Sequence, residues 1–129
     1  HELWRDLGFS SIEELLQFWE QDHLCQDAND LLTVLDTWQK GDISDNPVFR
    51  RDYEAALSAI AMPTRMMPCT TDLYFTEEGA SEDGLRMPGA TVESLESNWG
   101  HIAGGAGREA ASHNRILATA RALLSGQAS

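Results

Sequence analysis

Basic side chains and cysteine are both scarce in this chain. Its 129 residues include 9 Lys and Arg against 21 Asp and Glu, which gives a formal net charge of −12. Nucleic-acid binding needs Lys and Arg to neutralise phosphates, so this balance argues against nucleic acid, and equally against an anionic membrane surface. The two cysteines, Cys25 and Cys69, are too few and too far apart for a disulfide framework or a zinc site. We therefore expect a reducing, cytoplasmic location and neither a metal nor a cofactor.

Long apolar runs are also absent. No stretch approaches the roughly 18 residues that a membrane-spanning helix needs, and residues 1–6 lack the basic start and apolar segment of a signal peptide. A hydrophobic share of 42% and a charged share of 23% are ordinary for a globular chain, and the length predicts a single domain. Residues 1–62 hold 13 acidic and 4 basic side chains, which is typical of a solvated acidic helical face.

Helical patterns dominate the first half of the chain. Ser11 and Glu14 have the spacing of a capping box at the start of a helix. Further helices are expected over about 27–41 and over about 52–63, where a proline closes the pattern. Their apolar residues recur at helical spacing and are expected to face a core: Ile12, Leu15, Leu16 and Trp19; Ala28, Leu31, Leu32, Leu35 and Trp38; Tyr53, Ala56, Leu57 and Ile60.

Strand and helix patterns alternate in the second half. Residues 64–69 form a short apolar run bounded by prolines, typical of a buried strand, although Arg65 is unexpected there. A helix over 77–87 (weakened by two glycines), a second strand over 90–96 and a final helix over about 108–124 follow. This order predicts a right-handed βαβ unit with two parallel strands and a closing helix. Because two parallel strands do not make an independent sheet, we expect the unit to be part of a larger α/β fold.

The loops that follow the two predicted strands carry chemically capable side chains. Asp72 follows the first strand, and His101 follows the second, 29 residues later. The carboxyl ends of parallel strands meet at one edge of a sheet, where binding and catalytic sites are built. Asp followed by His is the order of the last two members of an α/β-hydrolase Ser–Asp–His triad. On spacing alone the alternative stays open that Asp72 caps a turn and His101 is an ordinary loop histidine.

Longer stretches of the sequence resemble one branch of the α/β-hydrolase superfamily. The stretches are Ala28 to Leu32, Thr37 to Ser44, Thr71 to Phe75 and Trp99 to Gly104. From about Asp27 to Gly107 the chain is similar to homoserine O-acetyltransferases. The resemblance implies an α/β fold in which residues 1–62 are a helical lid (cap) and residues 63–129 are the C-terminal βαβα part of the core, with two parallel strands that end a larger sheet.

The same resemblance implies roles for the two loop residues. Asp72 would be the triad acid and His101 the general base, in acyl transfer from a small acyl ester or acyl-CoA through a serine ester. The sequence has no G-x-S-x-G motif and no HGGG-type oxyanion loop. We therefore expect a missing N-terminal half, either upstream sequence or a separate chain, to supply the serine, and we expect this chain alone to be inactive.

Two other groups of residues have weaker chemical interpretations. Residues 105–110 match the dinucleotide-binding pattern G-x-G-x-x-A but lie too far from the preceding strand, so the glycines are expected to shape the loop after His101. His23 lies near Asp22 and Cys25 but lacks two further metal ligands, which indicates a turn between helices.

A second function class is a non-catalytic helical interaction module. Such a module would dock its apolar helix faces on a partner and would tolerate substitution of Asp72 and His101. Under the first hypothesis, in which residues 1–62 form a lid, three places are open for Trp4, Trp19 and Trp38: the core, an apolar acyl pocket, or a homodimer contact between lid helices.

Overall fold

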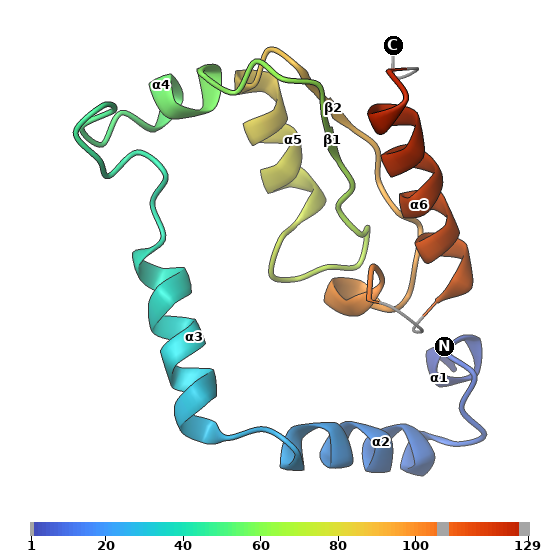
Figure 1. Cartoon of the computed structure of the whole chain (residues 1–129). Helices are drawn as coiled ribbons and strands as arrows, with labels where there is room; N and C mark the ends of the chain where they lie inside the picture. Colours follow the sequence, from blue (N-terminus) through green and yellow to red (C-terminus); the bar gives the residue numbers. More distant parts are fainter. Residues whose placement is uncertain (1, 106–108, 127–129) are drawn as a thin grey trace.

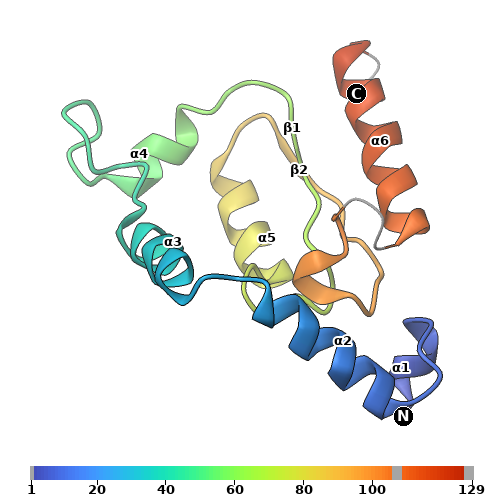
Figure 2. The same cartoon turned by 60° about the horizontal axis from the view of Figure 1, so that its bottom comes forward.

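The computed structural model describes residues 2–105 and 109–126. Helices α1 to α3 form an open arm, and α2 lies across the loops at the carboxyl ends of the two strands (Figure 1). Helices α5 and α6 lie on opposite sides of the strand pair in both views (Figures 1 and 2). The elements in chain order are α1 (Leu3–Asp6), α2 (Ile12–Leu24), α3 (Ala28–Lys40), α4 (Tyr53–Ser58), β1 (Thr64–Met66), α5 (Glu77–Arg86), β2 (Ala90–Val92), the 3-10 helix η1 (Gly100–Ile102) and α6 (Ala110–Leu124).

The predicted helix starts in the first half are confirmed by their caps. The Ser11 hydroxyl accepts a hydrogen bond from the Glu14 amide at 3.2 Å, and the Glu14 carboxylate accepts from the Ser10 amide at 2.6 Å. These two bonds form a capping box, except that the Glu14 carboxylate accepts from the amide of Ser10 and not from that of the N-cap residue, Ser11. The Asp27 carboxylate caps α3, and the Asp52 carboxylate caps α4, each by accepting hydrogen bonds from amides in the first turn of the helix. Helix α4 is shorter than expected and ends at Ser58, because the chain beyond it turns before the proline.

The predicted parallel strand pair is confirmed, with shorter strands. Thr64 to Met66 pair in register with Ala90 to Val92, and an isolated bridge joins Cys69 to Leu95 further along. The strand pattern is interrupted at Pro68, which has no amide hydrogen to donate. Within the pair, the Arg65 guanidinium donates to the hydroxyl of its register partner Thr91 at 2.8 Å. This cross-strand bond accounts for an arginine in a strand that was expected to be buried.

The glycines of α5 do not break the helix. A Cβ on Gly84 would lie 2.7 Å from Val92 Cγ2 and 3.6 Å from Met66 Sδ, so glycine at this position lets α5 approach the sheet closely. The cost in helix propensity, on the order of 1 kcal/mol, is offset by this packing. At the other end of the unit, α6 begins at Ala110; the expected start at residue 108 lies outside the described residues.

The apolar core is small and lies in α4 and the segments that follow it. It comprises Ala56, Leu57, Cys69, Met87, Leu95 and Ala103. The expectation that the apolar stripes of α2 and α3 are buried was wrong for this chain: Leu16, Trp19, Leu32 and Trp38 are each at least 50% exposed. The helical period predicts which residues share a face. It does not say what covers that face, and within the described chain little packs against it.

No helix in the described ranges is both long enough and apolar enough to cross a bilayer.

Candidate functional site

Asp72 and His101 meet beyond the carboxyl ends of β1 and β2. The His101 Nδ1 atom lies 3.1 Å from Asp72 Oδ2 and donates a hydrogen bond to it. The Asp72 side chain is 8% exposed, whereas the His101 side chain is 37% exposed. The parallel strand pair therefore brings together the two residues that sequence order singled out, with the carboxylate buried and the imidazole accessible.

The second oxygen of Asp72 organises its own loop. Asp72 Oδ1 accepts hydrogen bonds from the amides of Tyr74 at 2.8 Å and Phe75 at 3.1 Å. Asp72 thus caps a turn through one oxygen and bonds to His101 through the other. Burial raises the pKa of Asp72, but the hydrogen bonds from Tyr74, His101 and Phe75 outweigh it and hold the pKa below its ordinary value. Asp72 is consequently a carboxylate at neutral pH and accepts all three bonds.

Thr71 and Gly100 link the loop of Asp72 to the loop of His101. The Thr71 hydroxyl donates to the Ser97 carbonyl at 2.7 Å and accepts from the Gly100 amide at 3.1 Å. Gly100 has a φ of +56°, which L residues with side chains rarely adopt, and a Cβ there would lie 3.2 Å from the Thr71 carbonyl oxygen. These constraints fix the start of η1 and therefore the position of His101.

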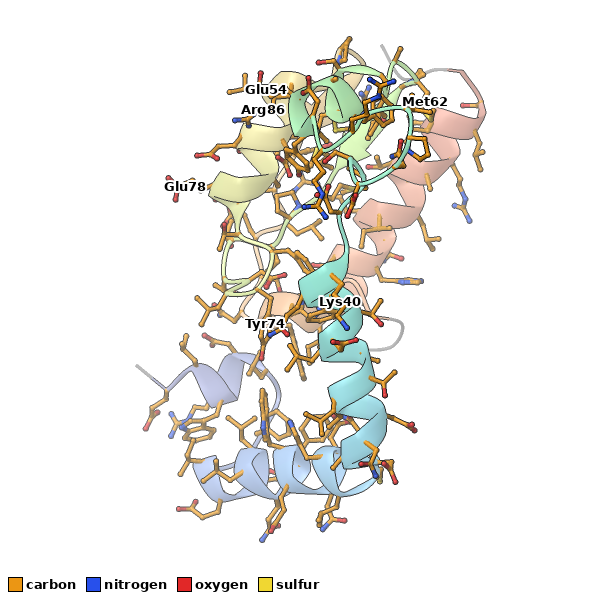
Figure 3. All side chains as sticks on the ribbon, turned by 90° about the vertical axis from the view of Figure 1, so that its left-hand side faces the viewer. Lys40, Glu54, Met62, Tyr74, Glu78 and Arg86 are labelled. Carbon is orange, nitrogen blue, oxygen red and sulfur yellow. The ribbon has the colours of Figure 1, made fainter. Side chains whose placement is uncertain are left out.

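Aromatic rings surround the His101 imidazole. Ring centroids of Tyr74, Phe75 and Trp38 lie 5.2, 5.3 and 6.2 Å from it. Figure 3 shows Tyr74 between α3 and α1, over the side of α2 that faces the sheet. The sequence left three places open for Trp38, namely the core, an apolar pocket or a homodimer contact, and in the structure its ring lines the same cavity as His101. The place of Tyr74 and Phe75 beside His101 could have been predicted from their position directly after Asp72.

Two cavities share His101 and Gly100 as lining residues. The larger has a volume of about 800 Å³ and lies between α2, α3 and the two loops. The smaller has a volume of about 400 Å³ and lies at the end of β1, against α5 and α6. His101 is thus accessible from two sides, and both volumes fall within the range of small-molecule sites, roughly 300–1,000 Å³.

The residues with weaker interpretations lie apart from the Asp72–His101 pair. His23 stacks on Trp19 with 5.3 Å between ring centroids, and its Nδ1 donates to the Trp19 carbonyl at 2.8 Å. Cys25 is exposed, whereas Cys69 is buried and lies 3.4 Å from the Ser97 carbonyl. Within 2–105 and 109–126 no three His, Cys, Asp or Glu side chains gather as a metal site would require. The glycine pattern over 105–110 falls partly outside the described residues.

The arrangement can perform proton transfer at His101. Because Nδ1 donates to a carboxylate, the neutral ring has its lone pair on Nε2, where it can accept a proton from a hydroxyl. Across the described part of the chain, no serine hydroxyl bonds to His101. The described residues therefore supply a hydrogen-bonded Asp–His pair with one ring nitrogen of His101 able to accept a proton.

Comparisons with known proteins find two curated relatives. Over 102 residues (78% of this chain) the sequence is 31% identical to a probable esterase of Corynebacterium glutamicum. Over 97 residues (74% of this chain) it is 31% identical to an ethyl acetate hydrolase of Pseudomonas veronii. The chain spans 29% and 27% of the lengths of these two relatives. Both names describe hydrolases, which supports a hydrolase-like family but not the homoserine O-acetyltransferase branch.

Neither a family model nor a solved structure matches the chain.

Proposed function

We propose that this chain is the Asp- and His-bearing C-terminal portion of a serine ester hydrolase with an α/β-hydrolase fold. Residues 1–62 would form the lid over the substrate, and residues 63–129 would form part of the core. The observation that carries the proposal is the Asp72–His101 hydrogen bond of 3.1 Å beyond the ends of two parallel strands. The names of the two relatives support an ester as the substrate.

In this proposal His101 first acts as a base. Its Nε2 takes the proton of a serine hydroxyl as the serine oxygen attacks the ester carbonyl, and Asp72 stabilises the imidazolium that forms. The imidazolium then gives the proton to the departing alcohol, which leaves an acyl-serine. Water, deprotonated by the same Nε2, attacks the acyl-serine, and the imidazolium returns the proton to the serine oxygen as the acid is released. If an alcohol accepts the acyl group in place of water, the reaction is that of an O-acyltransferase.

The serine would come from a polypeptide segment outside these 129 residues. Three features of the described chain support a partner segment at this place. β1 pairs with β2 along one edge, and the described chain offers no strand for its other edge. The 400 Å³ cavity that His101 lines lies at the carboxyl end of the same strand. Leu16 on α2 and Leu32 on α3, which line neither cavity, are exposed, as expected for surfaces that a larger fold covers.

A serine-directed probe tests this proposal. We would treat the protein from its native source with a fluorophosphonate and measure the intact mass of every polypeptide that co-purifies. A labelled serine on a segment continuous with, or bound to, this chain is expected. His101→Gln should slow labelling by about 10³-fold or more. His113→Gln, on α6, is the matched control and should label at the original rate.

Equal labelling of the His101→Gln and unsubstituted proteins would contradict the proposal. So would the absence of label from every co-purifying polypeptide. Either result would favour the non-catalytic interaction module, for which neither Asp72 nor His101 is needed.

A further inference from the structure

The larger cavity has two chemically different ends. At one end lie His101 and the aromatic side chains beside it, including Trp38 and Tyr74. At the other end lies the C-terminal half of α2, which with the turn after it contributes Asp22, His23 and Gln26 to the lining. Between them the lining is mostly apolar and aromatic, with Leu15, Phe18, Trp19, Leu73, Trp99 and Ile102. A ligand that reaches from His101 to α2 would thus cross apolar surface and then meet polar groups.

The His23 ring is held in place although it is exposed. It stacks on Trp19 with an interplanar angle of 21°, and Nδ1 donates to the Trp19 carbonyl. Because a carbonyl oxygen only accepts hydrogen bonds, Nδ1 carries the hydrogen, and Nε2 of the neutral ring carries the lone pair. Within the described ranges no protein group bonds to Nε2. A fixed ring with one unused acceptor is suited to bind a hydrogen-bond donor of a ligand.

The volume of the cavity indicates a ligand larger than the smallest esters. About 800 Å³ is typical of sites that enclose drug-sized molecules. Ethyl acetate, named for one relative, has only six non-hydrogen atoms and would leave most of this space unfilled. Four aromatic side chains in the lining, Trp19, Trp38, Tyr74 and Trp99, provide flat surfaces for an alkyl or aryl group.

We propose that the larger cavity binds an alkyl or aryl group of the substrate and that His23 Nε2 accepts a hydrogen bond from a donor, such as a hydroxyl, at the far end of that group. The inference deepens the proposed function, on which it rests, by naming the class of ester: one with a bulky apolar part that ends in a hydrogen-bond donor. His23 would then determine specificity and take no part in the proton transfers at His101.

Binding of two small probes tests the inference without any turnover. We would measure Kd for 4-ethylphenol and ethylbenzene by ligand-observed NMR, using the protein from its native source together with any co-purifying polypeptide. The two probes differ by one hydroxyl group. The unsubstituted protein should bind 4-ethylphenol about three- to tenfold more tightly, the net effect of one hydrogen bond.

Two substitutions separate the role of Nε2 from the structural role of the ring. His23→Phe keeps the stack on Trp19 and removes both nitrogens, whereas His23→Asn keeps a donor for the Trp19 carbonyl and removes Nε2. In both variants the ratio of the two Kd values should fall to about one, with the affinity for ethylbenzene unchanged. A thermal unfolding scan of each variant shows that the fold is retained.

Three results would overturn the inference: equal affinity for the two probes in the unsubstituted protein, an unchanged Kd ratio in both variants, or an equal loss of affinity for both probes. The last would mean that His23 only supports the end of α2. None of these outcomes depends on fluorophosphonate labelling, so failure of this inference and failure of the proposed function are separately visible.

Discussion

The Thr71 hydroxyl accepts the Gly100 amide at 3.1 Å and so ties the residue before Asp72 to the residue before His101. The same hydroxyl donates to the Ser97 carbonyl, which gives it partners on both sides of Trp99. The distance between the carboxylate and the imidazole is therefore controlled from outside the pair. Loss of this hydroxyl is expected to move the loops apart without touching either ionisable group.

Thr71→Val should lower both stability and activity. It removes the hydrogen bond to the Ser97 carbonyl and the one from the Gly100 amide, a cost of about 1–3 kcal/mol for the two bonds in the free energy of unfolding. Urea unfolding measures this change, and kcat/KM for an ester measures the displacement of His101. Thr71→Ser retains the hydroxyl and is the matched control. A loss with serine but not with valine would show that the methyl group, and not the hydroxyl, holds the loops.

Asp72→Asn should abolish most ester hydrolysis while the fold persists. The asparagine oxygen can still accept the Tyr74 and Phe75 amides, but the amide nitrogen cannot accept from His101 Nδ1. The His101 tautomer is then wrong, a change that costs about 10⁴-fold in kcat in a serine protease. Steady-state kinetics of the protein in its native form would check this. A loss of less than tenfold would contradict the assignment of Asp72 as the orienting acid.

Acidification should reduce the contribution of Asp72 to stability. Its pKa in the folded chain lies below the ordinary value of 3.8, so folding favours the carboxylate. The contribution is fully present above the unfolded pKa, near 3.8, and is lost as the pH falls through the lower folded value. We expect the difference in unfolding free energy between the unsubstituted protein and Asp72→Asn to be constant from pH 5 to 7. It should shrink below about pH 4. A difference that grows on acidification would contradict the direction of the pKa shift.

Gly84 and Gly79 of α5 should respond in opposite ways to alanine. At Gly84 the new Cβ would meet Val92 Cγ2 at 2.7 Å, so Gly84→Ala should destabilise the chain by about 1–3 kcal/mol. At Gly79 the nearest atom, the Thr76 hydroxyl oxygen, is 3.4 Å away, and Gly79→Ala should stabilise the helix by about 0.5–1 kcal/mol. Thermal unfolding of both variants measures the two changes. Stabilisation of the chain by Gly84→Ala would refute the close packing of α5 on β2.

Local signals in the sequence predicted the elements of this chain well. Hydroxyl and carboxylate caps marked the starts of α2, α3 and α4, because unpaired amides at helix N-termini need side-chain acceptors. The alternation of strand and helix patterns predicted the parallel pair, and strand order then placed Asp72 and His101 at one edge of it. These features depend on neighbouring residues or on the known handedness of one βαβ unit.

Features that depend on distant partners were not predictable in the same way. Helical spacing identified the face that contains Trp38 but gave no sign that its ring lies 6.2 Å from His101. The partner of Arg65 became evident only from the register of β1 with β2, which fixes Thr91 opposite it. In both cases the missing information is a contact between elements, which no local pattern encodes.

The Asp72–His101 contact also closes within one uninterrupted stretch of chain. Everything that aligns the two residues, from β1 through α5 and β2 to η1, lies between Thr64 and Ile102. The entropy of closing such a loop rises only slowly with its length, by about 0.6 kcal/mol for each doubling. The residues that align Asp72 and His101 are thus contiguous in sequence, and the entropic cost of bringing the two side chains together is that of closing one short loop.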